Sequence, residues 1–378
     1  MNTTEQKVRD SLVLNGRALL YHIERKEFQL STDLQNYFYL SKLIIGGTDF
    51  RSRTEDTGII PGLSPHEFNK DIKINETFNK NLSDLMDQRA TELIAWSKKQ
   101  NKKIYVCWSG GIDSTAILVS LLKNSDEAFK KNIEVVLSSS SFLENIEFYK
   151  KYILNKLECH SYSSFKIDGT FLRNNTFLCG DLADLIFNSI PFEPTLGSNY
   201  SNIKDKSKII DILNEKSLKV YNHNSIGEWF FNFLETNISN SNTTLNLTTF
   251  DDYCWWININ LRWNFESQRY LFYLKDRWDE ELDTALISDY IKNVFFNTKD
   301  FQNWSYMNLK NGYIGKMEIK DYIFDFDQNI VYRNYKLKER GSPPNLRNRH
   351  LQYIPVVVNK NYTSDLSTNQ LHDFLLTL

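Results

Sequence analysis

Residues 103–122 read KIYVCWSGGIDSTAILVSLL, and this stretch decides the expected fold. Its first part, Lys103 to Cys107, is a short apolar run with β-branched residues, which is typical of a buried strand. The run stops at Ser109-Gly110-Gly111, and an apolar helical pattern begins directly after it. We therefore predict a strand, a tight glycine turn and a helix in immediate succession.

The turn has the composition of an anion-binding loop. Gly110 and Gly111 can take a positive φ and let the backbone approach a ligand closely. The N–H groups of such a turn and of the following helix N-terminus can hold an anion, and Ser109 and Ser114 add hydroxyl donors. Asp113 would repel a phosphate unless a cation lay between them, which favours Mg²⁺. The alternative to an anion-binding loop is an N-capped helix that follows a strand, with a pair of glycines between them by chance. The strand before the turn and the helix after it make this alternative the weaker interpretation.

The run Ser-Gly-Gly-x-Asp-Ser at residues 109–114 resembles the pyrophosphate loop of the ATP pyrophosphatase (adenine nucleotide α-hydrolase-like, PP-loop) family. It is not a Walker A loop, because no Gly-Lys-Ser/Thr follows. In that family the loop grips the β- and γ-phosphates while the α-phosphate is attacked. The resemblance implies that ATP and its pyrophosphate are bound by Cys107, Ser109, Gly110, Gly111, Asp113 and Ser114.

The composition limits the class of protein. With 378 residues the chain is long enough for two domains, and its net charge of −2 gives no footprint of nucleic-acid binding. The four cysteines are far apart and form no Cys-x-x-Cys pair, which predicts a reducing compartment and no zinc site. No apolar run reaches transmembrane length, and residues 1–7 lack the pattern of a signal peptide. We expect a cytoplasmic protein without nucleic-acid or membrane partners.

The segments around the loop alternate between strand and helix patterns. Strands are expected at residues 132–138, 158–162 and 176–179, and helices at residues 76–100 and 144–157. The helix at 144–157 would place Ile146 and Ile153 on one apolar face. This alternation predicts an α/β fold whose parallel sheet carries helices on both faces, and the resemblance to the ATP pyrophosphatase family implies a sheet of the HUP or PP-loop type. Ligands bind such sheets at the carboxyl ends of the strands. A mostly helical part follows.

A second motif, Cys-Gly-Asp-Leu-Ala-Asp-Leu-Ile-Phe at residues 179–187, follows the last expected strand. It resembles the asparagine synthetase passage Ser-Gly-(Asp/Glu)-Gly-Ala-Asp-Glu-Leu-Phe. Gly180, Asp181 and Asp184 fall in register, whereas Leu182 replaces a glycine and Leu185 replaces an acidic residue.

The resemblance assigns roles to this motif. It implies that Asp113 and Asp184 together hold Mg²⁺ and that Asp181 is a general base near the incoming amine. Backbone groups of Cys179, Gly180 and Leu137, with Cys107, would contact the adenosine. Taken by themselves, the two aspartates of the motif are better explained by the acidic first turn of a helix, and only the preceding Ser-Gly-Gly-x-Asp-Ser loop favours the site.

Residues 1–75 are expected to form a small β-rich domain, and residues 76–378 the ATP pyrophosphatase domain. Ser11 to Leu14 run into Asn15-Gly16, a hairpin signal. The order of motifs through Pro61-Gly62 resembles the end of the glutaminase domain of asparagine synthetases. That domain needs an N-terminal cysteine nucleophile, but position 2 is Asn and the first cysteine is Cys107. We expect a truncated remnant without glutaminase activity.

Two late lysines are candidates for the phosphate-binding lysine of the family. Gly315-Lys316-Met317-Glu318-Ile319-Lys320 resembles the passage Gly-Lys-x-x-Lys, and residues 330–336 resemble Arg-x-Lys. The resemblance implies that Lys320, if one residue is inserted, or else Lys316, stabilises the developing pyrophosphate. A surface lysine is the alternative for either one.

The resemblance implies an ATP-dependent ligase that forms amide bonds. ATP with Mg²⁺ would convert a small carboxylate into its acyl-adenylate and release pyrophosphate. Ammonia, free or supplied by a separate protein, or an amine of the substrate would then take the acyl group. Two alternatives stay open: a nucleotide-binding protein impaired in catalysis, which the leucines of the second motif suggest, and a PP-loop enzyme that modifies tRNA or nucleotides.

Overall fold

The computed structural model describes residues 11–15, 36, 74–138, 141–162, 164–187, 203–221, 226–241, 245–263, 266, 284–312, 315–336 and 355–359. The chain divides into two compact units. The sheet unit comprises residues 75–187 and 267–341, and the second unit comprises residues 1–74, 188–266 and 342–378. In the sequence-based prediction, by comparison, residues 76–378 form one domain.

The sheet unit is built on a parallel sheet of four strands. The strands are β2 (Lys103–Cys107), β3 (Ile133–Leu137), β4 (Glu158–Ser161) and β5 (Asn175–Leu178). Their spatial order is β4-β3-β2-β5, and every neighbouring pair is parallel. The predicted strands and the parallel α/β class are therefore confirmed. The chain moves outward from β2 to β4 and then returns to place β5 on the other side of β2. Ligands bind at such a reversal, beyond the carboxyl ends of the strands.

The sheet is buried along β3, where Ile133, Glu134, Val135 and Val136 are each at most 3% exposed. Consecutive burial is typical of a parallel strand covered on both faces. The charge of Glu134 is compensated by an ion pair with Lys103 of β2 and by a 2.6 Å contact with His160 Nε2 of β4.

Tyr105 extends this face of the sheet. Its ring packs at 5.4 Å from Phe165 and 4.9 Å from Phe171, which belongs to α9 (Gly169–Asn174). Because Tyr105 pairs with Glu134 in the register, aromatic rings cover the face that carries the buried carboxylate. The aromatic rings therefore cover the centre of this face of the sheet.

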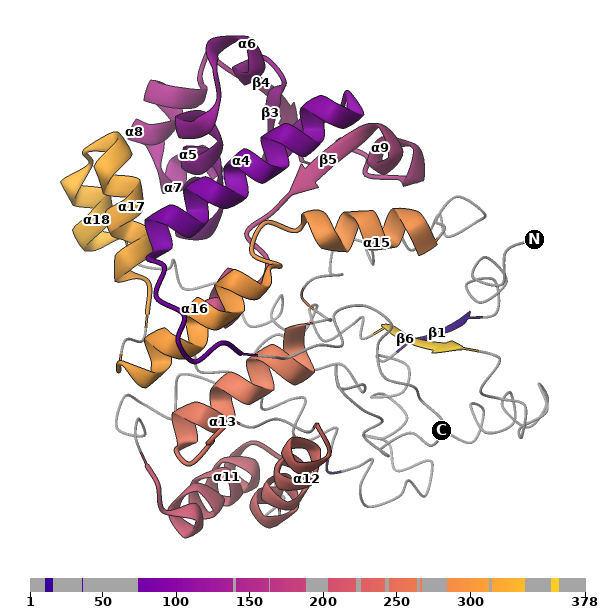
Figure 1. Ribbon diagram of the computed structural model, residues 1–378, viewed down its shortest axis with the longest axis vertical. Helices are drawn as coiled ribbons and strands as arrows, with labels where there is room; N and C mark the ends of the chain where they lie inside the picture. The colour runs from indigo at the N-terminus through magenta and orange to yellow at the C-terminus, as the bar shows by residue number, and fades with distance from the viewer. Residues whose placement is uncertain are drawn as a thin grey trace. The chain divides into compact units, whose positions relative to one another are not determined.

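Helices distant in sequence pack together in the sheet unit. α4 (Leu82–Gln100) and α5 (Ile112–Asn124) lie beside α17 (Met317–Asp327), which is followed by α18 (Ile330–Tyr335), as Figure 1 shows. Tyr322 of α17 donates a 2.6 Å hydrogen bond to Asp87 of α4, and Lys123 of α5 forms a 2.6 Å ion pair with the same carboxylate. This network fixes α17 against the first strand-helix unit. The sheet unit also contains α6 (Glu127–Lys130), α10 (Ala183–Ile186), α15 (Thr284–Asn293) and α16 (Lys299–Lys310).

Two predicted helices differ from the observed ones. The helix expected from residue 76 begins at Leu82, because Asn81 caps it by accepting a hydrogen bond from the Asp84 N–H. The helix expected at 144–157 is divided into α7 (Ser141–Glu144), α8 (Ile146–Phe148) and the π-helix η1 (Tyr149–Ile153). Asn145 interrupts it by capping the Phe148 N–H. As a result Ile146, expected on the apolar face, is 42% exposed.

The second unit is mostly helical where it is described. It contains α11 (Lys206–Tyr221), α12 (Ile226–Asn240), α13 (Phe250–Trp256) and the π-helix η4 (Ile257–Arg262). β1 (Ser11–Asn15) pairs antiparallel with β6 (Pro355–Asn359). The rest of the expected β-rich segment, including Gly16 of the hairpin signal and Pro61-Gly62, lies outside the described residues apart from Asn36, Ile74 and Asn75. Among the helices that the structure describes, none is long and apolar enough to cross a membrane.

Candidate functional site

The glycine turn connects β2 to α5. Gly110 has a φ of +77°, whereas Gly111 has a φ of −73°. Only the first of the two glycines therefore uses a conformation that other residues avoid. A Cβ atom at Gly110 would lie 2.2 Å from the Ser141 carbonyl oxygen and 2.7 Å from Glu144 Cβ. The turn thus passes tightly against the segment that follows β3.

Two serines line the start of α5. The Ser109 N–H donates to Ser114 Oγ at 3.1 Å, and the hydroxyls of the two residues lie 3.1 Å apart. The Gly111 N–H donates to Ser109 Oγ at 3.2 Å, and α5 begins without a side-chain cap. The predicted donors Ser109, Gly111 and Ser114 are therefore together at a helix N-terminus, where hydroxyl and N–H groups can bind an anion.

The second motif meets the first one at Gly180. A Cβ atom there would lie 2.9 Å from Asp113 Cβ and 3.3 Å from the Ser114 nitrogen. This contact follows from the sheet order, because β5 and β2 are neighbours and each motif follows the carboxyl end of its strand. The two aspartate-containing motifs therefore meet at the reversal of the strand order.

Lys316, at the N-terminus of α17, joins the two motifs. Its Nζ lies 2.6 Å from both carboxylate oxygens of Asp113 and 2.6 Å from Asp184 Oδ1. The side chains of Lys316 and Asp113 are 19% and 22% exposed, and that of Asp184 is 42% exposed. Burial lowers the pKa of the Lys316 ammonium, but the attraction of the two carboxylates outweighs it and raises the pKa above its usual value. Lys316 is therefore a permanent positive charge in the site.

The two carboxylates are suitable ligands for Mg²⁺. Because Asp113 and Asp184 contact one ammonium, their oxygens are close enough to share a cation. In the part of the chain that the structure describes, no group of three or more His, Cys, Asp or Glu side chains could hold a metal ion. Mg²⁺ in nucleotide sites is bound by one or two carboxylates together with substrate phosphates. The pair of aspartates fits that kind of donor set.

The other late lysine is placed differently. Lys320 Nζ donates to the Lys336 carbonyl oxygen at 3.1 Å. The contact with the two aspartates is made by Lys316, the second choice of the sequence analysis, and Lys320 lies one helical turn farther along α17.

Asp181 is 4% exposed and accepts a 3.0 Å hydrogen bond from the Cys179 thiol.

Cys107 and Leu137 end β2 and β3, on the sheet edge that bears the glycine turn. The Leu137 carbonyl accepts a 2.8 Å hydrogen bond from the Tyr162 N–H. The structure brings Ser109, Gly111, Asp113, Ser114, Gly180, Asp184 and Lys316 into direct contacts, and places Cys107 and Leu137 at the same edge.

Leu182 occupies the position of a glycine in the passage that the second motif resembles. Its φ is +70°, in the left-handed region, and its side chain is only 2% exposed. A left-handed residue with a side chain costs about 1–2 kcal/mol. Burial of the leucine offsets this cost, so the backbone shape suited to glycine is kept without glycine.

Three residues at the glycine turn were missed as site residues in the sequence analysis. The Tyr332 hydroxyl donates to the Gly110 carbonyl oxygen at 3.1 Å. Lys336, whose side chain is 9% exposed, forms a 2.8 Å ion pair with Glu144, beside Gly110. Tyr332 and Lys336 both lie in the passage that resembles Arg-x-Lys, and Glu144 follows the second strand.

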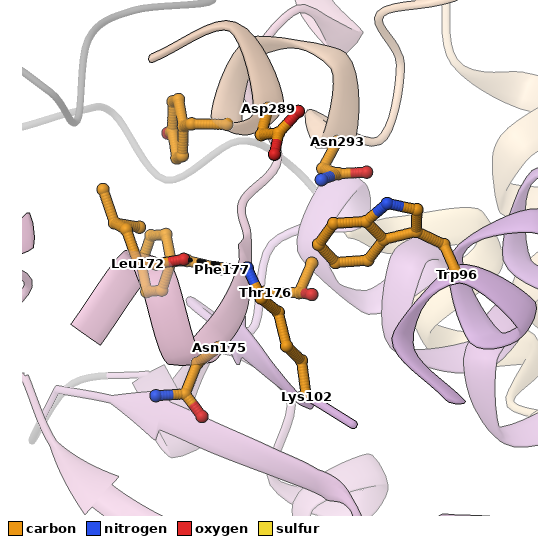
Figure 2. Close-up of a pocket in the computed structure, with 9 residues that line it drawn as sticks. Trp96, Lys102, Leu172, Asn175, Thr176, Phe177, Asp289 and Asn293 are labelled. Carbon is orange, nitrogen blue, oxygen red and sulfur yellow. Dashed lines mark hydrogen bonds between the residues drawn. The ribbon is translucent and has the colours of Figure 1, made fainter. Parts of the chain in front are cut away.

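A small pocket lies at the other end of the sheet (Figure 2). Its lining includes Trp96, Lys102, Asn175 and Thr176. Lys102 lies 4.9 Å from the centre of the Trp96 ring and donates to the Leu172 carbonyl at 3.2 Å. Lys102 precedes β2 and Asn175 begins β5, so the pocket is at the amino ends of the strands and is separate from the two motifs.

Comparison with known proteins gives no relative. No family model, no curated protein and no solved structure matches the chain. We therefore infer function from the residues of the site and their chemistry.

Proposed function

We propose that the sheet unit is an ATP-dependent amide-bond-forming ligase of the PP-loop type, similar to the synthetase domain of asparagine synthetases. The observation that carries the proposal is the contact of Gly180 with Asp113 and Ser114, together with the Lys316 bridge from Asp113 to Asp184. Two loops with phosphate-binding and metal-binding groups thereby meet where the strand order reverses, which is where parallel α/β sheets bind ligands.

The residues suggest a division of roles for ATP binding. The Gly111 N–H, the hydroxyls of Ser109 and Ser114 and the start of α5 would bind the β- and γ-phosphates. Asp113 and Asp184 would hold Mg²⁺, which shields the phosphate charge when it is bound. Lys316 can turn from the carboxylates to the phosphates, where a fixed positive charge stabilises the leaving pyrophosphate.

The reaction would proceed in two steps. A carboxylate oxygen of the substrate attacks the α-phosphorus, the bond to the β-phosphate oxygen breaks and pyrophosphate leaves. An amine nitrogen then attacks the acyl carbon, and the bond from that carbon to AMP breaks. Asp181, which stands at the first acidic position of the resembled passage and accepts a 3.0 Å hydrogen bond from the Cys179 thiol, is a candidate acceptor for the proton of the amine. The amine is ammonia, supplied free or by a separate protein, or an amine of the substrate.

Exchange of ³²P-pyrophosphate into ATP tests the first step. With Mg²⁺ and a panel of small carboxylates that includes aspartate, we expect exchange that depends on one acid. Asp113→Asn and Asp184→Asn should each reduce it at least about 100-fold, as the loss of one electrostatic group typically does. Asp300→Asn is the matched control, since Asp300 forms a 2.9 Å ion pair with Lys80 elsewhere in the same unit. Exchange that survives both of the first two substitutions would falsify the proposal.

A nucleotide-binding protein without turnover is the second candidate. Leu185 stands where the resembled passage has an acidic residue, and it is 1% exposed in α10. The carboxylate of that position is therefore missing from the site. Tight ATP binding by calorimetry with no exchange for any carboxylate would favour this second candidate over the ligase.

A further inference from the structure

The hydroxyl of Tyr332 reaches the glycine turn from α18. Tyr332 is 6% exposed, and its hydroxyl lies 3.1 Å from the Gly110 carbonyl oxygen and 3.5 Å from Thr115 Oγ1. Thr115 also accepts a 3.1 Å hydrogen bond from Trp108 Nε1. The phenol is thus enclosed by residues of the turn and of α5, and the shorter contact identifies the Gly110 carbonyl as its acceptor.

This hydrogen bond determines where a neighbouring N–H points. The Gly110 carbonyl and the Gly111 N–H belong to one peptide group, and in a planar trans peptide they point in opposite directions. Holding the carbonyl on Tyr332 therefore turns the Gly111 N–H away from α18. In the structure that N–H points to Ser109 Oγ at 3.2 Å, among the donors proposed to bind phosphate.

The turn needs such a constraint because of Gly110. Glycine has no Cβ, so the peptide that follows it can rotate with little steric resistance. A rotated peptide would direct the carbonyl oxygen, rather than the N–H, at the phosphates. On the other side of Gly110, the segment with Glu144 is held by Lys336, four residues after Tyr332, through the 2.8 Å ion pair. Tyr332 of α18 and Lys336 at the end of α18 thus constrain Gly110 from two sides, through the Gly110 carbonyl and through the segment of Glu144.

We propose that Tyr332 is a positioning residue for phosphate binding: its hydroxyl orients the Gly110–Gly111 peptide so that the Gly111 N–H faces the pyrophosphate group. The role rests on the proposed function, because it needs an anion at the turn. Loss of one hydrogen bond to a charged group predicts about 10-fold to 100-fold weaker binding of pyrophosphate.

Tyr332→Phe tests this role, because it removes the hydroxyl and keeps the ring. Tyr152→Phe is the matched control: the Tyr152 hydroxyl also donates to a backbone carbonyl, that of Phe326 at 3.3 Å. We would measure the binding of inorganic pyrophosphate with Mg²⁺, and of ATP, by calorimetry on the full chain, and the Tm of each variant. We expect weaker binding only in Tyr332→Phe, and a similar small loss of Tm in both variants.

A second measurement follows the N–H itself. The chain has 14 glycines, so ¹⁵N-glycine labelling gives a spectrum in which the Gly111 signal can be assigned through Gly111→Ala. Pyrophosphate should shift this signal in the parent protein and shift it less in Tyr332→Phe at equal saturation.

The outcomes distinguish a failure of the proposed function from a failure of the positioning role of Tyr332. If the parent protein binds neither pyrophosphate nor ATP, the proposed function fails and the positioning role fails with it. If the parent binds them and Tyr332→Phe binds equally well with the same Gly111 shift, only the positioning role is refuted. Equal weakening in Tyr152→Phe would also refute it, since the effect would then be one of general stability.

Discussion

Gly110→Ala places a methyl group at the most constrained point of the glycine turn. Its φ is +77°, and the new Cβ would lie 2.2 Å from the Ser141 carbonyl oxygen and 2.7 Å from Glu144 Cβ. The left-handed conformation costs a residue with a side chain about 1–2 kcal/mol. Pushing an extra carbon into a packed region typically adds about 1–3 kcal/mol. We therefore expect the free energy of unfolding to fall by about 2–5 kcal/mol.

Alanine substitutions at two other glycines separate the conformational contribution from the packing contribution. Gly312 has a φ of +78° and would place a Cβ with nothing within 4 Å, so Gly312→Ala should cost only the conformational part, about 1–2 kcal/mol. Gly111 has a φ of −73°, and a Cβ atom there would have Ser109 Oγ as its nearest neighbour, at 3.1 Å. Gly111→Ala should stay within about 1 kcal/mol of the parent, because alanine adopts this φ and lowers the entropy of the unfolded chain.

Equilibrium urea unfolding, followed by circular dichroism and by tryptophan fluorescence, measures the order of the three variants. The expected order of destabilisation is Gly110→Ala, then Gly312→Ala, then Gly111→Ala. If Gly110→Ala cost no more than Gly312→Ala, the close approach of the turn to Ser141 and Glu144 would be wrong, and with it the account of the glycine turn.

Three further predictions concern other parts of the sheet unit. Lys316→Met should lower pyrophosphate exchange at least about 100-fold and Lys320→Met less than about 10-fold, because only Lys316 bridges the aspartates; the opposite order in the same assay would restore Lys320 as the functional lysine. Burial raises the pKa of Glu134, but hydrogen bonds from its lysine, histidine and tyrosine neighbours lower it more, so the net shift is downward. Its stabilising effect is therefore present above the unfolded-state pKa of about 4.3 and is lost as the pH falls through the folded-state value. Glu134→Gln should cost about 1–2 kcal/mol at pH 7 and progressively less below about pH 4, as measured by urea unfolding across this range; a constant difference would contradict this assignment. Leu182→Gly should unfold at higher urea than Leu182→Ala, the reverse of the usual order, because glycine relieves the left-handed φ of +70° while both variants lose the buried isopropyl group of the leucine; equal midpoints would mean that the strain is absent.

Local patterns in the sequence were sufficient to predict the strands of the sheet and to locate the two motifs. The apolar run at 103–107, the Gly-Gly turn and the apolar helix after it predict β2 and α5, because each depends on neighbouring residues. The strands β3, β4 and β5 were located by the same means. Where a single side chain interrupts a pattern, as Asn145 does, the prediction of a continuous helix was wrong.

The sequence by itself determined which residue types stand at the strand ends, since Asp113, Gly180 and Asp184 belong to short motifs that local composition reveals. Only the tertiary structure decided that β5 lies beside β2 and so brings Gly180 against Asp113. It also brought Lys316 to Asp113 and Tyr332 to Gly110. The physical reason is that these contacts join residues more than 60 positions apart. Their geometry depends on the packing of α17 and α18 against the first strand-helix unit, which no local pattern encodes.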